Sequence, residues 1–374
     1  MEKLKIKFET IRFPLIILFV TVTLKGLSHT LLSEPFYTML VVNFKWLITL
    51  MEITRDFSGL LIKYLPFIIV IKVLGKKHSS ERVVLMFIVS YLLFLTVTKI
   101  VGQSTLPPIV YENLFGMSTT VSSGQLVKNS INLVPFRLGF IGVIIVGYIS
   151  DLSFRKTRSR TRYGFLPYID KDVLGLITTI FLTTIAAVGF SYIWPTAINL
   201  LYKVFEWIAR DITNPVSTFV YGFLDRILSL LNISDINRES FWFTSLGGSW
   251  MNDLGENFVG DISIWNQQIK NGIFNSGFGR FITPYYIVNL FAIPGFVLGV
   301  YSLYTNKRER LNVLSFSLLI IIVSMFADLS LPLEIFLVIM APMLYAFHLF
   351  TVSSLFAILQ GFKIFIGSVY SGPV

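Results

Sequence analysis

The sequence has no cysteine, only 3 histidines and few charged residues for its length. The absence of cysteine excludes disulfides, thiolate metal sites and a phosphocysteine carried by this chain. Charged residues make up 14% of the 374 residues, whereas 54% are hydrophobic. Soluble domains carry about 25% charged residues, and a soluble core cannot hide this much apolar side chain. The composition therefore excludes an ordinary soluble protein, and we expect neither a cofactor nor a metal.

Long apolar stretches recur along the chain, and several approach the ~20 residues that a helix needs to cross the ~30 Å hydrocarbon layer. Their continuity favours helices, because the strands of a membrane barrel alternate apolar and polar residues. The sequence therefore predicts an all-α integral membrane protein with about ten transmembrane helices plus re-entrant segments. The apolar segments are 13–33, 36–54, 58–74, 83–101, 135–152, 173–193, 195–213, 216–231, 281–304, 312–327 and 333–359.

Short basic clusters flank these apolar segments and carry much of the net charge of +10. They lie at residues 3–12, 76–82, 155–162 and 307–310, and the third contains the run RKTRSRTR. Lysine and arginine in short loops stay on the cytoplasmic side of a membrane. The pattern predicts a multi-pass membrane protein with a cytoplasmic N-terminus. Because the basic residues flank the apolar segments, we expect membrane lipid as a partner and no nucleic acid.

Two polar segments interrupt the apolar pattern. Residues 232–280 form a polar insert, which is either an external loop or a re-entrant element that lines a water-filled cavity. In FADLSLPLE, residues 326–334, Asp328 and Glu334 flank Pro332, which predicts a break between two helices. A carboxylate within a membrane domain is costly unless it faces a cavity or a partner. We therefore expect these polar side chains to meet a polar guest within the bilayer.

Four stretches, in order, resemble the integral membrane component (enzyme IIC) of the glucose and maltose branch of bacterial phosphotransferase systems. IWP at 193–195 precedes YGFLDRIL at 221–228, which is similar to the family's YGFLNRLL. FAIPGFVLGVY at 291–301 resembles FGLPAAALAMY, and LPLEIFLVIMAPMLYAFH at 331–348 resembles EPIEFSFLFVAPLLYVIH. The resemblance covers roughly residues 135–359, while the first 130 residues match only in hydropathy.

The resemblance implies a homodimeric sugar permease of the bacterial cytoplasmic membrane that works by alternating access. It implies an N-terminal transmembrane bundle for dimerisation, residues 1–162, and a substrate-binding transport domain with re-entrant elements, residues 163–374. Members of the family pass phosphate to the sugar from a cysteine on a cytoplasmic partner, enzyme IIB. Because this chain has no cysteine, its IIB would be a separate protein.

The matched motifs nominate substrate-binding residues. Glu334 matches the second glutamate of the family's TEPIE motif, a position that resembles a sugar ligand, and a carboxylate can accept two sugar hydroxyls. The alternative is an ion pair that holds two helices together. Arg226 matches the arginine of YGFLNR and would contact the sugar or a phosphate, or pair with Asp225 or Glu334. His348 also lies at a matched position, with a hydrogen-bonded structural histidine as the alternative.

Two aspartates complete the candidate site. Asp328, at the predicted helix break, would bind substrate or cap the following turn. Asp235 is a candidate because the family's GLHH reads Asn232, Ile233, Ser234 and Asp235 here, so both histidines are missing. The first glutamate of TEPIE is Leu331, and the family's KRFVP reads YGFLP at 163–167.

These departures leave different functions open. The first is a phosphorylating permease in which Asp235 or Asp328 handles the proton. The second is a non-phosphorylating facilitator, receptor or membrane partner subunit that has lost phosphotransfer. An unrelated class of transporter also stays open, because a fold alone does not define a function.

Overall fold

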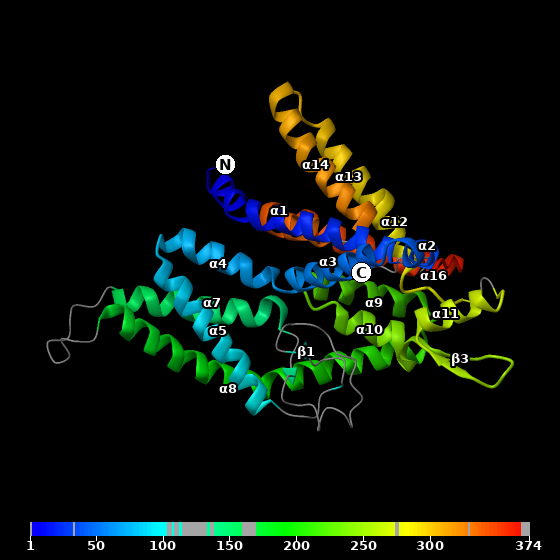
Figure 1. Cartoon of the computed structure of the whole chain (residues 1–374), viewed down its shortest axis with the longest axis horizontal. Coiled ribbons are helices and arrows are strands. Elements are labelled where there is room, and N and C mark those ends of the chain that lie inside the picture. Colours follow the sequence, from blue (N-terminus) through cyan, green and yellow to red (C-terminus); the bar gives the residue numbers. More distant parts are fainter. Residues whose placement is uncertain are drawn as a thin grey trace. The chain divides into compact units, whose positions relative to one another are not determined.

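Helices make up nearly all of the regular structure (Figure 1). The computed structural model describes residues 2–32, 34–102, 107, 112–113, 133–134, 138–158, 170–273, 277–327 and 330–367. The chain divides into two compact units, the first with residues 1–14, 63–203 and 231–233, and the second with 15–62, 204–230 and 234–374. The predicted boundary between residues 162 and 163 lies outside the described residues.

In the first unit, three helices pack against one another and a long fourth follows. These are α4 (Leu65–His78), α5 (Glu81–Val101), α7 (Gly139–Arg158) and most of α8 (Lys171–Arg210). Helix α5 buries Val83, Met86, Phe87, Ser90, Tyr91, Phe94 and Thr98, a spacing of three and four residues that gives one continuous face. Strands β1 (Glu112–Asn113) and β2 (Leu133–Val134) pair antiparallel.

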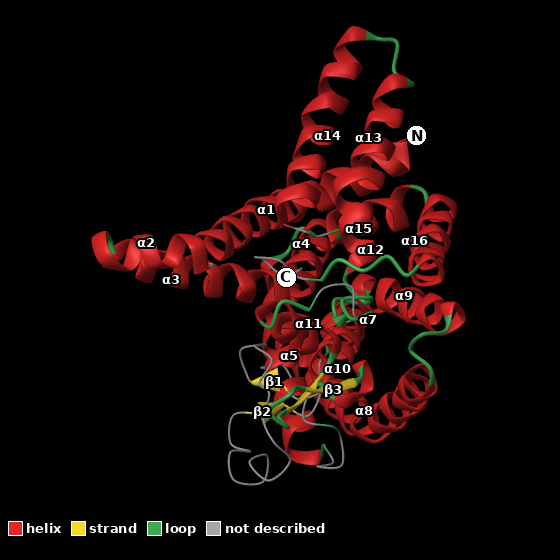
Figure 2. Ribbon diagram, turned by 90° about the vertical axis from the view of Figure 1, so that its right-hand side faces the viewer, coloured by secondary structure: helices red, strands yellow, loops and turns green. Residues whose placement is uncertain are grey.

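The second unit begins with most of α1 and two further helices. After the last residues of α8 it continues with a series of shorter and broken helices. The first are α1 (Glu2–Leu31), α2 (Glu34–Asn43) and α3 (Lys45–Lys63). The later ones are α9 (Pro215–Leu230), α10 (Asp235–Phe243), α11 (Asp261–Lys270), α12 (Thr283–Ile287), α13 (Ile293–Ser302), α14 (Lys307–Ala327), α15 (Leu331–Met340) and α16 (Pro342–Phe362). A π-helical turn, Val288–Ala292, joins α12 to α13, and Figure 2 shows α13 and α14 side by side.

Helices α9 and α16 form the most extensive helix pair of the second unit. Gly222 of α9 faces the ring of Phe356, and a Cβ added at Gly222 would lie 2.5 Å from Phe356 Cδ2. Thr218 Oγ1 donates a hydrogen bond to the Phe356 carbonyl at 3.3 Å. The absence of a side chain at residue 222 therefore allows the close approach that positions the buried face of α9.

Five helical segments among the described residues are long and apolar enough to cross a membrane, or six if α3 and α4 count as one bent span. They are Phe13–Leu31, Glu81–Val101, Lys171–Arg210, Thr283–Ser302 and Pro342–Phe362. The chain is therefore an all-α, membrane-embedded protein. The larger predicted number, about ten crossings, is not confirmed, because several apolar segments form helices too short to span ~30 Å.

Helix boundaries differ from the prediction at two prolines. The segments 173–193 and 195–213 are one helix of 40 residues that contains Pro195. Conversely, 333–359 is divided between α15 and α16 at Ala341, which has φ −149° and ψ 69°. The predicted break near Pro332 does fall between two helices, because α14 ends at Ala327 and α15 begins at Leu331.

The polar insert is folded rather than irregular. It contains α10, a 3₁₀ turn (Ser245–Gly247), the antiparallel strands β3 (Ser249–Met251) and β4 (Asn257–Val259), and α11. The carboxylate of Asp261 is fully buried and accepts hydrogen bonds from the N–H groups of Gly279 and Phe281, at 2.9 and 3.1 Å. Burial raises the pKa of Asp261 to about 6, although Arg280 and these N–H groups oppose the shift.

Candidate functional site

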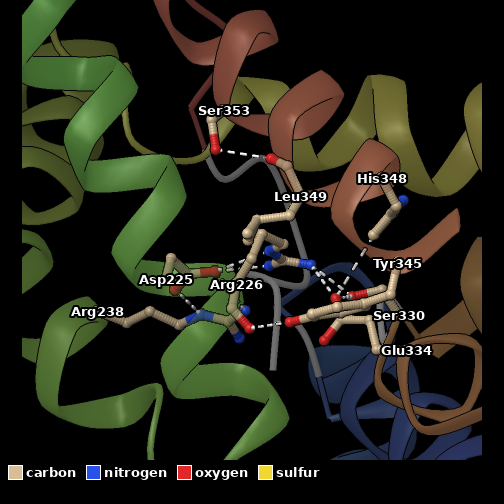
Figure 3. Close-up of polar contacts among 9 residues, drawn as sticks. All are labelled: Asp225, Arg226, Arg238, Ser330, Glu334, Tyr345, His348, Leu349 and Ser353. Atoms are coloured by element: carbon tan, nitrogen blue, oxygen red, sulfur yellow. Dashed lines mark hydrogen bonds and ion pairs between the residues drawn. The ribbon is translucent and has the colours of Figure 1, made fainter. Parts of the chain in front are cut away.

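Four charged side chains form a buried network in the second unit (Figure 3). Arg238 Nε of α10 lies 2.9 Å from Asp225 Oδ1 of α9. Arg226 Nη2 lies 2.6 Å from Asp225 Oδ2, and Arg226 Nη1 lies 2.8 Å from Glu334 Oε1 of α15. Their exposed fractions are 7% or less. We call Arg238, Asp225, Arg226 and Glu334 the charge network.

The periodicity of α9 explains why its two charges point inward. The buried residues of this helix are Ser217, Thr218, Tyr221, Gly222, Asp225, Arg226, Leu228 and Ser229, which recur every three to four residues. They form one face of an amphipathic helix, and the charges occupy its middle. A buried ionic pair on this face therefore follows from the same pattern that packs α9 against its neighbours.

Helix α15 places Glu334 in its first turn. Glu334 N donates to the Ser330 carbonyl at 3.0 Å, and Ser330 Oγ donates to Glu334 Oε1 at 2.7 Å. Arg226 Nη1 donates to the same serine oxygen. A carboxylate in the first turn also interacts favourably with the helix dipole. The ten residues of α15 extend only ~15 Å, so this carboxylate belongs to a half-length helix.

The charge network is electrically balanced, with two arginines and two carboxylates. Opposite charges must pair closely in a buried environment, because desolvation of an isolated ion is costly. The ring of Tyr285 adds a further contact, since its centroid lies 5.0 Å from the Arg226 guanidinium carbon and 4.9 Å from that of Arg238. Each charge of the network therefore has an opposite charge within 2.9 Å.

One carboxylate oxygen of the network lacks a hydrogen bond. Glu334 Oε1 accepts from Arg226 and Ser330, whereas Oε2 has no hydrogen-bond partner among the described residues. His348 Nε2 lies 3.7 Å from Glu334 Oε1, within ion-pair range but beyond hydrogen-bond distance. Tyr345 donates its hydroxyl to the Arg226 carbonyl at 3.2 Å. Glu334 Oε2 is thus a buried acceptor that no described residue uses.

The structure brings three of the predicted site residues together. Glu334, Arg226 and His348 meet at the charge network (Figure 3). Asp235 lies in the first turn of α10, about one helical turn before Arg238. Asp328 lies outside the described residues.

The ion-pair interpretation of Glu334 and Arg226 describes their geometry. Glu334 is 0% and Arg226 1% exposed, so neither faces open solvent as we expected for a site that meets a polar guest. Asp225, which was considered only as a partner of Arg226, is in fact bonded by both arginines. The structure therefore shows this region in a closed arrangement.

Arg238 and Ser330 are the members of this cluster that sequence reasoning missed. Arg238 lies in the polar insert, where no matched motif or apolar pattern marked it. Ser330 directly precedes the helix that carries Glu334, and its position four residues before that glutamate was a usable signal. Within the part of the chain that the structure describes, no group of three or more histidine, aspartate or glutamate side chains is placed to hold a metal ion.

No family model matches the chain.

Proposed function

We propose that the chain is a membrane sugar permease of the phosphotransferase enzyme IIC type. It moves a sugar across the cytoplasmic membrane by alternating access, and a separate IIB protein supplies the phosphate. The observation that carries this proposal is the buried Arg226–Glu334 pair, in which Glu334 Oε2 accepts no hydrogen bond from a described residue. Ionisable residues within membrane domains mark substrate pathways by default.

The broken helices around Glu334 support a transport role. Transporters bind substrates near the middle of the bilayer between discontinuous helices, because the free helix ends there present polar groups. Helix α15 has this character, since it follows a break after Ala327 and ends at a second break at Ala341. A sugar hydroxyl can donate to Glu334 Oε2, and its oxygen can accept from a guanidinium.

The closed charge network requires a movement before a sugar can bind. Arg226 uses Nη1 for Glu334 and Ser330, and Nε and Nη2 for Asp225. A guest that replaces the Arg226–Glu334 contact must therefore separate α9 from α15 while Asp225 keeps Arg226 neutralised. The arrangement suits a cycle in which the empty site closes on its own ion pair.

The domain roles and partners belong to the same proposal. Residues 1–162 form the dimerisation bundle of a homodimer, and residues 163–374 form the transport domain. The phosphate passes from the cysteine of IIB to the sugar, and Asp235 or Asp328 takes the proton of the attacking hydroxyl. The first turn of α10 places Asp235 on the same helix as Arg238 of the charge network.

A non-phosphorylating facilitator, receptor or membrane partner subunit is the second candidate. It is favoured by Ser234 and Asp235, which stand where the resembled family has histidines. An aspartate lacks the near-neutral pKa that suits imidazole to acid–base catalysis.

Vesicles that contain the purified chain separate the two candidates. With a cognate IIB and a phosphate donor, the first candidate predicts sugar-dependent phosphate consumption and phosphorylated sugar inside the vesicles. If the sugar equilibrates across the membrane and stays unmodified, the phosphorylating proposal is wrong. A panel of hexoses and disaccharides without IIB provides the control for transport alone.

A further inference from the structure

A cavity of about 550 Å³ lies at one end of the first unit. Four helix ends meet there, because α4 and α7 end and α5 and α8 begin beside it. The residues that line it include Ser80, Arg82, Thr157, Arg158, Lys171 and Asp172. None of them belongs to the charge network, so the cavity calls for a separate explanation.

Positive charge exceeds negative charge in the cavity wall. Asp172 is paired with Arg82, and Asp170 Oδ1 accepts a hydrogen bond from Lys171 N at 2.7 Å. Arg158 and Lys171 form no ion pair with any described residue, and the Arg158 guanidinium lies 5.6 Å from the centre of the Phe154 ring. Two exposed cations therefore remain available to a ligand.

The surroundings of the cavity reinforce this positive charge. Residues 76–82, 151–158 and 170–172 carry seven lysines and arginines against four aspartates and glutamates, a net charge of +3 without histidine. Two long helices, α5 and α8, begin at the cavity, and helix N-termini attract anions through their free N–H groups and dipoles. The N-cap residue of α5, Ser80, makes no side-chain capping bond. The site favours an anion.

Close packing between helices closes the cavity on the side that faces the interior of the helix bundle. A Cβ added at Gly175, one turn into α8, would lie 2.8 Å from Met86 Cε and 3.1 Å from Thr157 Oγ1. These contacts join α8 to α5 and α7 at Thr157, which also lines the cavity. The close packing of α7 and α8 therefore continues up to the cavity wall.

An exposed apolar ridge begins beside the cavity. Along α8, the side chains of Val173, Ile177, Phe181 and Ile185 recur every four residues and are 48% to 63% exposed. The first of them directly follows the lining residue Asp172. A free phosphate ion would not contact this ridge, whereas a ligand with a phosphate and acyl chains would contact both the basic cavity and the ridge.

We propose that the cavity binds the phosphate headgroup of an anionic phospholipid of the phosphatidylglycerol type. Arg158 and Lys171 contact the phosphate, and one acyl chain lies along the α8 ridge. Basic pockets between transmembrane helices on the cytoplasmic side are suited to such headgroups. The predicted cytoplasmic position of the surrounding basic clusters assigns the lipid to the inner leaflet.

The test compares two double variants of the full chain that lose the same charge. Arg158→Gln with Lys171→Gln removes the two free cations of the cavity, and Lys76→Gln with Lys156→Gln removes two cations nearby that do not line it. Native mass spectrometry on protein from nanodiscs of mixed phosphatidylcholine and phosphatidylglycerol measures the retained lipid. We expect the first variant to lose phosphatidylglycerol affinity roughly tenfold or more, and the control to retain it.

Three results would overturn the proposal. Equal loss in the two variants would mean that general surface charge attracts the lipid, and no loss in either would mean that the cavity does not bind it. Displacement of the lipid by millimolar inorganic phosphate would identify a site for free anions instead. Melting temperatures of both variants in detergent establish that they are folded before lipid binding is compared.

Discussion

At the scale of single residues, the two carboxylates of the charge network have different surroundings. Asp225 accepts four hydrogen bonds, two from Arg226 and two from Arg238. From the residues that the structure describes, Glu334 accepts hydrogen bonds at Oε1 and none at Oε2. This difference suits a mainly structural role for Asp225, and it leaves Glu334 Oε2 as the acceptor that the proposed sugar would use.

We therefore predict that Asp225→Asn lowers stability and that Glu334→Gln removes sugar binding. Asp225→Asn leaves two buried guanidiniums with a single carboxylate, and should lower the free energy of unfolding by about 3 kcal/mol or more. Glu334→Gln should abolish sugar binding, while Asp225 still pairs with Arg226 and the dimer stays intact. Unfolding in detergent, size-exclusion chromatography and a direct sugar-binding assay measure these effects. Unchanged sugar affinity in Glu334→Gln would refute its assignment.

The buried carboxyl of Asp261 predicts a pH dependence of stability. Its pKa is raised from 3.8 to about 6 in the folded protein, mainly by burial, and Arg280 faces it. The folded state therefore binds the proton more tightly than the unfolded state. Its contribution to stability is present at pH 4 and is lost as the pH rises through about 6. Melting temperatures from pH 4 to 8 should show this decline, and Asp261→Asn should flatten it.

Motif reading predicted part of the candidate site at residue level. Glu334, Arg226 and His348 were proposed from short matched stretches, and the structure brings them together. Arg238 could not be proposed in this way, because its contact with Asp225 joins α10 to α9 across the unmatched start of the insert. Which charges share a network depends on tertiary packing, and no local spacing encodes it.

At the scale of secondary-structure elements, the packing of α9 on α16 depends on Gly222. A methyl group at this position meets the Phe356 ring, which cannot move freely because it also contacts Tyr221 and Tyr285. Gly222→Ala should therefore cost about 1–3 kcal/mol of unfolding free energy. Phe356→Leu in the same chain should recover part of the loss, as a double-mutant cycle in detergent would measure. Additive losses would contradict the proposed contact.

The prolines of this chain were an unreliable guide to its helix breaks. The residue before a proline avoids the helical region, and Ala341 before Pro342 obeys this rule, so that break was readable from the sequence although we predicted one continuous segment there. Pro195 suggested a break that the structure lacks. Membrane helices tolerate proline because neighbouring groups satisfy the freed carbonyl, and this tolerance depends on the surroundings.

At the scale of the whole molecule, the apolar composition and the continuity of the apolar stretches were sufficient to predict an all-α membrane protein. The number of crossings could not be predicted in this way, since a short apolar segment can form either a span or a half-length helix. The 40 residues of α8 and the ten of α15 depart from a single crossing length in opposite directions. The length of an apolar segment alone therefore predicts neither of these two helices correctly.

The predicted orientation of the molecule is directly testable because the chain has no cysteine. Ser159→Cys introduces a single thiol into the basic run RKTRSRTR. The positive-inside rule predicts that an impermeant maleimide labels it only after the cells are opened. Labelling of intact cells would overturn the orientation.

Accessibility of the charge network distinguishes a transport site from a fixed helix contact, because the Arg226–Glu334 pair is buried in this structure and the proposed permease requires it to separate. Ser330 donates to Glu334 Oε1 and is 5% exposed, and Ser353 on α16 is a fully buried control. In proteoliposomes, we expect Ser330→Cys to react with a water-soluble methanethiosulfonate and a transported sugar to slow the reaction. Ser353→Cys should stay unreactive. If Ser330→Cys is as inert as the control, with or without sugar, the charge network is a permanent helix contact and the permease proposal is wrong.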